Sequence, residues 1–353
     1  MVRPEATASR VVVEAWRGPR VESQHDVWCA IVPPVVGLPS EVDPADLPAP
    51  FMRSAAKPMQ LLPVVAAGGA ERYGLDAADL AVMAASHSGT DAHANRVAAI
   101  LGRLGLGPEA LRCGVHWPYF LEELPAESAE RRRLFGPLHN NCSGNHAALL
   151  ALAQIAAVDP GRYLDPTTPG QERVHAAIGA LAGADPVLAV DDCSAPCYGM
   201  PLECMAEAYR FLARPAAVRT LTGARRERLC RVGDLGRVEA ALERIAAAMA
   251  SEPEWVSGTT SGATRLARAL PGAIVAKYGA EGVLCVANLE HGMAVALKVA
   301  DGNSRALMPA LLAVAADLGW LGSDTTAALG DLAEPILHGR VGQVVGGLRV
   351  RRG

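Results

Sequence analysis

The sequence predicts an α/β protein of the α+β type, with one antiparallel sheet built from both chain ends and a helical region inserted between them. Strand-like segments lie within about residues 10–50 and 260–353, and helical periodicity dominates about residues 54–255. Chains in which strands and helices occupy separate stretches pack their helices against an antiparallel sheet. A length of 353 residues suits two domains or one large fold with an inserted lobe. We expect a single domain over residues 1–353, without internal repeats.

The predicted strands come in two groups. Residues 11–16 and 26–32 are rich in valine and tryptophan, and the Gly-Pro turn between them predicts a hairpin. A short apolar run at residues 187–190 predicts a strand inside the helical region. The strands expected from the C-terminal part span residues 274–279, 282–284, 293–299 and 341–350.

The predicted helices are alanine-rich and mostly amphipathic. A short apolar helix is expected to begin near Ser54 and to end within residues 64–73. Residues 80–85 fit either a buried strand or a helix. The other expected helices span residues 93–104, 122–135, 147–157, 169–181, 205–212, 237–250 and 305–318.

Composition excludes several functional classes. The net charge is −4 and no extended basic block occurs, so we do not expect nucleic acid as a partner. No apolar stretch is long enough to span a membrane. The N-terminus lacks the apolar core of a secretory signal, and the eight cysteines have no framework spacing. These features indicate a reducing cytoplasm.

The first candidate site lies at the start of the predicted short helix. Ser54 stands at or just before the first turn, and Lys57 follows one turn later on the same face. A serine at a helix N-terminus with a lysine in reach is a nucleophile with a base, and backbone N–H groups there can meet an oxyanion. The alternative is a capping serine beside a surface lysine.

Two further polar clusters follow apolar segments. Ser86, His87 and Ser88 end the apolar run of residues 80–85, where side chains lie at the rim of a core. The densest cluster, residues 138–146, opens an alanine-leucine helix. It is either a functional site or an elaborate cap with a satisfied histidine.

Three motifs stand in the order used by serine β-lactamases and penicillin-binding proteins. These are Ser54-x-x-Lys57, Ser86-His87-Ser88 and Lys277-Tyr278-Gly279. The order predicts an acyl-transfer site with two hydroxyls, Ser54 and Ser86, and two amines, Lys57 and Lys277. A lysine can act as a base when burial beside a second ammonium lowers its pKa.

The amino acids that make up these motifs resemble another family more closely, the asparaginase II family of class 3, thermolabile-type L-asparaginases. The resemblance runs from about residue 11 to residue 350 and includes residues 21–25. Six motifs carry it in order, at residues 53–60, 86–89, 113–118, 139–147, 191–196 and 277–283. It implies a β-lactamase-like fold, a homodimer, and hydrolysis of L-asparagine to L-aspartate and ammonia.

The resemblance also implies the roles of single residues. Ser54 pairs with Lys57 and Ser86 with Lys277, and Ser54 is the expected nucleophile. Arg53 suits an α-carboxylate, and Asp191 suits an α-ammonium. The other implied substrate-binding residues are His87, Cys142, His146 and Gly279.

The family implies a zinc ion held by two cysteines and a lysine. The cysteines are present as Cys142 and Cys193, but Asn145 replaces the lysine. Because an amide oxygen is a poor zinc ligand, two readings stay open: a zinc site, with Cys197 as a substitute ligand, or two buried thiols without metal. Asp192, Ser194 and Thr90 also depart from the family pattern.

The sequence is therefore compatible with three functions. The first is an L-asparaginase acting through a serine ester. The second is a related serine hydrolase for another small amide or ester, such as a glutamine-like substrate or a specialised metabolite, which the departures at Asn145, Asp192 and Ser194 suggest. The third is a non-catalytic protein that binds an amino acid, against which the retention of two serines and two lysines speaks.

Overall fold

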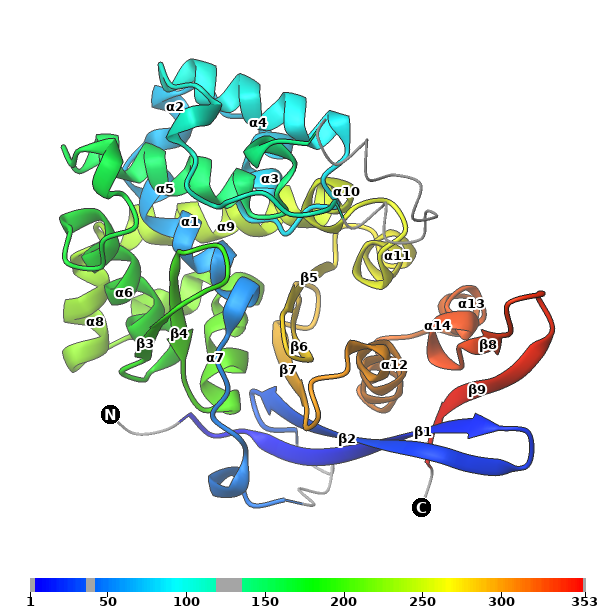
Figure 1. The fold of residues 1–353 in the computed structure, drawn as a ribbon. Coiled ribbons are helices and arrows are strands. Elements are labelled where there is room, and N and C mark those ends of the chain that lie inside the picture. The colour runs from blue at the N-terminus through cyan, green and yellow to red at the C-terminus, as the bar shows by residue number, and fades with distance from the viewer. Residues whose placement is uncertain (1–3, 36–41, 119–134, 352–353) are drawn as a thin grey trace.

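Strands from both chain ends lie in one antiparallel sheet. The computed structural model describes residues 4–35, 42–118 and 135–351. The seven strands run in the order β5-β6-β7-β2-β1-β9-β8, and every pairing is antiparallel (Figure 1). Their bounds are β1 Thr7–Arg17, β2 Arg20–Val32, β5 Ile274–Gly279, β6 Val283–Asn288, β7 Met293–Val299, β8 Ile336–His338 and β9 Val344–Val350. The predicted α+β class and the sheet built from both ends are confirmed.

A second, two-stranded sheet lies within the helical region. It pairs β3 (Val187–Val190) with β4 (Pro196–Gly199). The strand at residues 187–190 is confirmed, whereas β4 was not predicted, because its short proline- and glycine-containing sequence carries no strand pattern. All four β3 residues are exposed and all four β4 residues are buried. The hairpin loop between the two strands carries Asp191, Asp192 and Cys193.

The helices form two groups. The segment between β2 and β5 contains α1 Lys57–Ala66, α2 Gly69–Arg72, α3 Ala77–Met83, α4 Asp91–Arg103, α5 Ser143–Ile155, α6 Pro169–Ala182, α7 Leu202–Ala213, α8 Gly223–Cys230, α9 Leu235–Ser251, α10 Pro253–Ser257 and α11 Gly262–Ala269. The C-terminal segment contains α12 Leu307–Asp317, α13 Ser323–Ala328 and α14 Gly330–Ala333. The sequence did not predict α8, α10, α11, α13, α14 or β8, which are all short.

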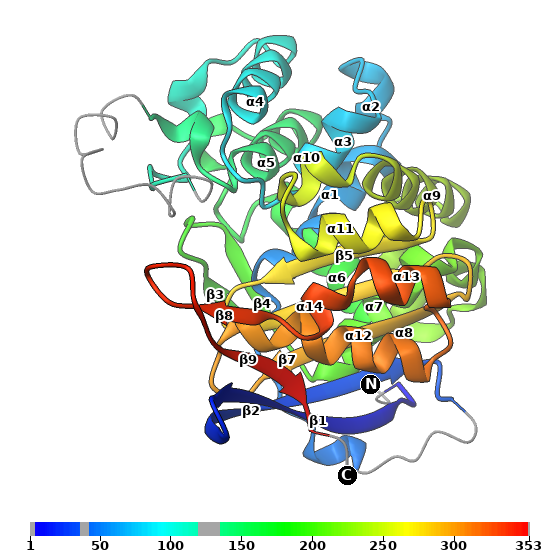
Figure 2. The ribbon, with the colours of Figure 1, turned by 90° about the vertical axis from the view of Figure 1, so that its right-hand side faces the viewer.

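Two apolar cores lie on opposite faces of the large sheet. Along β6, Val283, Cys285 and Ala287 face the larger core, and Leu284 and Val286 face the smaller one. This alternation follows from the two-residue period of a strand. Helix α7 covers the larger-core face, while α11 and α12 cover the other, as Figures 1 and 2 show. The sheet is thus a middle layer that is buried along β5, β6 and β7 and more exposed at β8 and β9.

The structure decides several local predictions. Residues 80–85 belong mainly to α3, so the helix alternative holds there. Ser54 does not cap α1: it lies in a 3-10 turn, η2 (Arg53–Ala56), that leads into the helix, and no side chain caps either element. The helix predicted at residues 122–135 falls almost wholly outside the described residues. Within the described ranges, no helix combines the length and apolarity needed to cross a bilayer.

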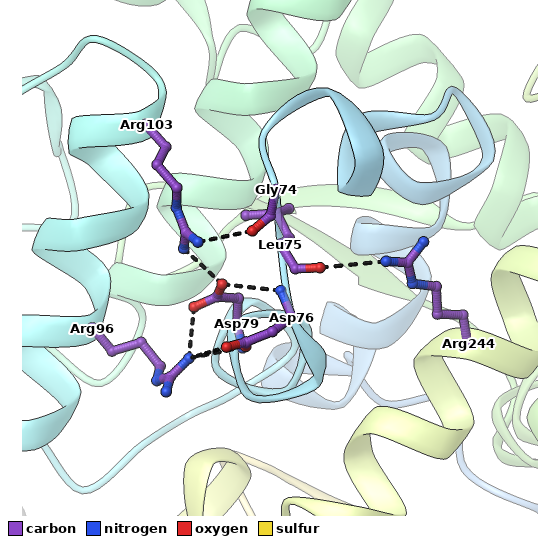
Figure 3. Close-up of polar contacts among 7 residues, drawn as sticks. All are labelled: Gly74, Leu75, Asp76, Asp79, Arg96, Arg103 and Arg244. Carbon is purple, nitrogen blue, oxygen red and sulfur yellow. Dashed lines mark hydrogen bonds and ion pairs between the residues drawn. The ribbon is translucent and has the colours of Figure 1, made fainter.

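An ion-pair cluster holds α3 against α4 (Figure 3). Asp79, almost completely buried, receives Arg96 Nη1 at 2.8 Å and Arg103 Nη2 at 2.6 Å. Asp76 caps α3 and forms a capping box with Asp79, and Arg96 also bonds Asp76. Because α3 ends three residues before Ser86, this cluster helps to set the position of that serine.

Replacing Asp79 with alanine should destabilise the fold. The change leaves two partly buried guanidinium groups without their carboxylate and removes half of the capping box, so we expect a loss of about 3 kcal/mol in the free energy of unfolding. Urea denaturation measures the loss. The matched control is Asp331→Ala, which breaks the exposed Arg265–Asp331 pair and should cost less than about 1 kcal/mol. Equal losses would contradict the role of burial.

Candidate active site

The chain enters α1 through an unusual backbone conformation. Arg53 has a φ of +50°, a left-handed conformation that costs free energy for a residue with a side chain. The preceding residue is held in place, because Met52 N–H donates to Tyr198 O at 2.7 Å. On the other side, a Cβ at Gly279 would lie 2.5 Å from Met52 O, so β5 can approach this turn only with glycine there.

Two lysine amines meet at one serine hydroxyl. Lys57 Nζ lies 2.9 Å from Ser86 Oγ, and Lys277 Nζ lies 2.8 Å from the same oxygen. Lys57 begins α1, Ser86 follows α3 and Lys277 lies in the edge strand β5. Three segments far apart in the sequence therefore converge on the Ser86 hydroxyl.

The environment lowers the basicity of Lys277. Its side chain is fully buried, and burial together with the nearby Lys57 charge holds the pKa of Lys277 well below its ordinary value of 10.5. A neutral amine at this position can take a proton from the Ser86 hydroxyl. The backbone carbonyl of Tyr278 accepts one of its hydrogens at 2.9 Å.

The contacts differ from the implied pairing of Ser54 with Lys57. Both lysines contact Ser86, and Ser54 makes no side-chain hydrogen bond to any residue in the described ranges. Lys57 instead extends from the first turn of α1 toward Ser86 and Cys142, where it donates to the sulfur at 3.1 Å. Ser54 lies at the open side of this cluster and borders the cleft.

The cleft has two lobes that meet at Ser54. The first, here called the Arg53 lobe, has a volume of about 510 Å³ and is bordered by Arg53, Cys142 and Asp191 among others. The second, here called the Lys277 lobe, has a volume of about 450 Å³ and is bordered by Ser86, Lys277 and Gly279 among others. Both lobes share Ser54, Asn141 and Ala280.

Charged side chains line the Arg53 lobe. Arg53 Nη2 contacts Asp191 Oδ1 at 2.9 Å and Asp192 Oδ2 at 2.6 Å. Burial disfavours the ionised Asp191, but the hydrogen bond and charge of Arg53 outweigh it and hold the pKa of that carboxyl below its ordinary value. The Arg53 Nε atom is buried and has no partner among the described residues. The lobe thus offers both a guanidinium donor and a carboxylate.

The two candidate zinc ligands form a hydrogen-bonded sulfur pair. The Cys193 thiol donates to the Cys142 sulfur, and this bond, with the Lys57 charge, lowers the pKa of the Cys142 thiol despite its burial. The same bond and burial raise the pKa of the Cys193 thiol. The Cys142 sulfur therefore lies among the Cys193 thiol, Lys57 Nζ at 3.1 Å and Asn141 Oδ1 at 3.2 Å.

This donor set does not fit the zinc ion that the family implies. A zinc ion in a protein is held by at least three protein ligands, and nowhere in residues 4–35, 42–118 and 135–351 do three or more histidine, cysteine or acidic side chains gather as a metal site. Asn145 is buried at 1% exposure, and both atoms of its amide group lack a partner in the described part of the chain. No step of the reaction proposed for this site is therefore assigned to a metal.

His87 lies behind the cleft. Its ring is fully buried, receives the Gly89 N–H at 3.1 Å on Nδ1 and lies 2.9 Å from Ser143 Oγ through Nε2. Burial, with the charge of the neighbouring His93, holds the pKa of His87 well below its ordinary value. This neutral ring positions the loop after Ser86 and borders neither lobe.

His146 is buried in a similar way. Its Nδ1 lies 2.6 Å from the Tyr163 hydroxyl, which accepts the Arg112 N–H and so donates to the ring. Burial lowers the pKa of His146 to about 3. Like His87, this implied substrate-binding residue borders neither lobe, whereas Arg53, Cys142, Asp191 and Gly279 do.

Two asparagines join the site without having been assigned a role. Asn140 accepts the Cys142 N–H at 2.8 Å and donates to Cys113 O at 2.8 Å, which fixes the start of α5. Asn141 borders both lobes. Their place inside the polar cluster of residues 138–146 was the available sequence signal. Ser257, Glu281 and Ser304 also border the cleft, and no motif marks Ser257 or Ser304.

A hydroxyl held by two buried amines beside a polar cleft is the arrangement of an enzyme active site, because a structural ion pair would satisfy each lysine with a carboxylate. The family comparison agrees. The sequence model described as L-asparaginase II matches residues 13–350, and the chain belongs to this family. Membership makes it an amidohydrolase of the asparaginase type. No curated protein matches the chain.

Replacing Asn145 with lysine should create a zinc site. Asn145 lies one turn after Cys142 on the same face of α5, so a lysine there restores the family donor set. We expect wild-type protein to hold far less than one zinc per chain, and Asn145→Lys to approach one. Elemental analysis of zinc-dialysed protein measures both.

The control is Asn145→Lys with Cys193→Ser, which removes one sulfur ligand and should lose the zinc again. Stoichiometric zinc in the wild type, removable with a chelator at the expense of activity, would show that Asn145 does not disrupt the site.

Proposed function

We propose that this chain hydrolyses L-asparagine to L-aspartate and ammonia through an ester on a serine. The observation that supports it is the contact of Lys57 and Lys277 with the Ser86 hydroxyl, at a cleft that Arg53 and Asp191 border. The family match supports the same chemistry.

The Arg53 lobe would hold the amino-acid end of the substrate. A guanidinium group binds a carboxylate through charge-assisted hydrogen bonds, and the buried Arg53 Nε has an unused donor. Asp191 is ionised, so it suits the α-ammonium group. In this pose the side-chain amide points toward Ser54, where the two lobes meet.

Ser54 is the proposed nucleophile. Its Oγ forms an ester bond with the amide carbon, and the carbon–nitrogen bond breaks. The hydroxyl proton would pass to Ser86 once the two hydroxyls come into contact with substrate bound, and from Ser86 to the neutral amine of Lys277, which returns it to the leaving nitrogen as ammonia forms. Lys57 keeps Ser86 in place and supplies positive charge near the developing oxyanion.

Water then hydrolyses the ester by the reverse route. Ser86 and Lys277 remove a proton from the water molecule, its oxygen bonds to the acyl carbon, and the bond to Ser54 Oγ breaks. The proton returns to Ser54, and L-aspartate leaves from the Arg53 lobe. Both half-reactions use the same relay, as the symmetry of acyl transfer requires.

Three further proposals concern the fold family, the oligomeric state and the cellular location. The motif order and the antiparallel sheet with helices on both faces support a β-lactamase-like fold. Family resemblance supports a homodimer, which light scattering tests. All eight cysteines are free thiols, which supports a reducing cytoplasmic location.

Loss of Ser54 should abolish ammonia release from L-asparagine. We expect Ser54→Ala to lower kcat/KM by at least about 10³-fold because it removes the nucleophile. Ser86→Ala should cost about 10²- to 10⁴-fold because it interrupts proton transfer. Mass spectrometry of acid-quenched protein should find the ester on the Ser54 peptide, and an ester on Ser86 would reverse the two roles.

The matched control is Ser88→Ala, since Ser88 follows Ser86 closely but borders neither lobe. Its ammonia release should stay near wild type. Turnover of glutamine or another amide without turnover of asparagine would contradict the proposed substrate. Tight asparagine binding without turnover, unchanged by Ser54→Ala, would show a binding protein instead.

The pH profile should report the Lys57 charge. Lys277 acts as a base only when neutral, so kcat falls as the pH drops through the lowered pKa of Lys277. Lys57→Met removes a nearby positive charge, which raises that pKa, and the acid limb of kcat should move to higher pH. Steady-state rates between about pH 5 and 10 locate the limb. An unmoved limb would argue against Lys277 as the base.

A further inference from the structure

The cleft is larger than the proposed substrate needs. Each lobe has a volume that suits a drug-sized ligand, and the lobes meet at Ser54. If asparagine places its amino-acid end in the Arg53 lobe, its side-chain amide reaches Ser54. Most of the Lys277 lobe then lies beyond the leaving nitrogen.

Serine hydroxyls line this remaining space. Ser257, Ser261 and Ser304 border the Lys277 lobe. The hydroxyls of Ser257 and Ser304 make no hydrogen bond to any other described residue, so they are available to a ligand. Neither residue takes part in the proton relay. Two such hydroxyls in the lining of the lobe favour a polar occupant.

Glycines also border this lobe. Gly282 and Gly302 both have positive φ, and they border the lobe beside Glu281. A Cβ at Gly302 would lie 2.8 Å from Glu281 Oε2, so a side chain there would displace the carboxylate. A Cβ at Gly282 would likewise lie 2.8 Å from Val299 Cβ, so glycine is required at both positions by neighbouring protein atoms. The room for a group larger than hydrogen on the leaving nitrogen is the volume of the lobe itself, about 450 Å³.

The charges of the lobe select among such groups. Glu281 and Lys277 are the charged residues among its described lining, and no arginine borders it. A carboxylate on the leaving group would approach Glu281 without a guanidinium to pair with. A hydroxyl or an ammonium group would find hydroxyls and a carboxylate.

We propose that the enzyme also hydrolyses L-asparagine derivatives whose side-chain amide nitrogen carries a small polar group that is neutral or positively charged, with that group bound in the Lys277 lobe. The inference rests on the proposed function and extends it to the leaving group. Ser54 Oγ bonds to the acyl carbon, the carbon–nitrogen bond breaks, and the relayed proton yields a free primary amine. Water then releases L-aspartate.

The experiment compares four substrates on purified wild-type protein: asparagine and the hydroxyethyl, aminoethyl and carboxymethyl derivatives of its side-chain amide. Chromatography measures L-aspartate release in every case. We expect turnover of the hydroxyethyl and aminoethyl amides, with kcat/KM at least about tenfold above that of the carboxymethyl amide.

Two variants then test the location of the substituent. Ser257→Leu and Ser304→Leu should each lower kcat/KM for the hydroxyethyl amide, relative to that for asparagine, by about tenfold, because leucine fills the lobe and removes a hydroxyl. The control Ser323→Leu changes an exposed serine at the start of α13, outside both lobes, and should leave this ratio unchanged.

The outcomes separate the two proposals. Turnover of asparagine without turnover of any substituted amide overturns the inference and leaves the proposed function standing. If the substituted amides are turned over while neither Ser257→Leu nor Ser304→Leu changes kcat/KM for the hydroxyethyl amide relative to asparagine, that result overturns the placement of the substituent in the Lys277 lobe. Failure of all four substrates overturns the proposed function and the inference with it, whereas turnover of the hydroxyethyl amide alone supports the inference and replaces asparagine as the preferred substrate.

Discussion

The structure depends on two lysine amines buried against one hydroxyl. Removing an ammonium group from water is costly unless partners replace the lost hydration. Here Ser86 Oγ, the Cys142 sulfur and the Tyr278 carbonyl accept from the amines, and burial together with the Lys57 charge lowers the pKa of Lys277. The Cys142 sulfur therefore replaces part of the hydration that Lys57 loses on burial. This is a structural role for Cys142 that requires no metal.

The scaffold holds these amines at fixed positions. Strand β5 is the edge of the large sheet, and the η2 turn lies directly against it through the contact between Gly279 and Met52. This contact brings the turn that carries Ser54 to the last residue of β5, and Ser54 and Lys277 border the same lobe. On the other side, the Asp79 cluster ties α3, and hence Ser86, to α4.

The sequence predicted the fold class and the residues that gather at the candidate site. Of the two implied pairings, the structure has the contact of Ser86 with Lys277 but not that of Ser54 with Lys57. Motifs located Ser54, Lys57, Ser86 and Lys277 because each stands beside a recognisable turn or apolar run. The i, i+3 spacing predicted that Lys57 would face Ser54, yet spacing cannot say where a flexible lysine side chain ends. Tertiary contacts decide that, and they direct Lys57 toward Ser86.

Other failures have similar causes. Strand β4 is four residues long and exists because β3 and the η2 turn lie beside it, so its own residues give no periodic signal. His87 and His146 belong to the polar motifs that predicted the site, but they support its walls through Ser143 and Tyr163. A motif shows that a segment matters and does not separate the residues that touch a ligand from those that hold the segment.

The convergence of α1, the end of α3 and β5 also affects the rate at which the active site forms during folding. Lys277 reaches Ser86 only after β5 joins a sheet whose central strand, β2, comes from the first 32 residues. Contacts between such distant segments form slowly, because the chain between them loses conformational entropy before the contacts can stabilise the fold. Recovery of activity after denaturation therefore indicates that the whole sheet has formed. A chain that has formed only its helices is inactive.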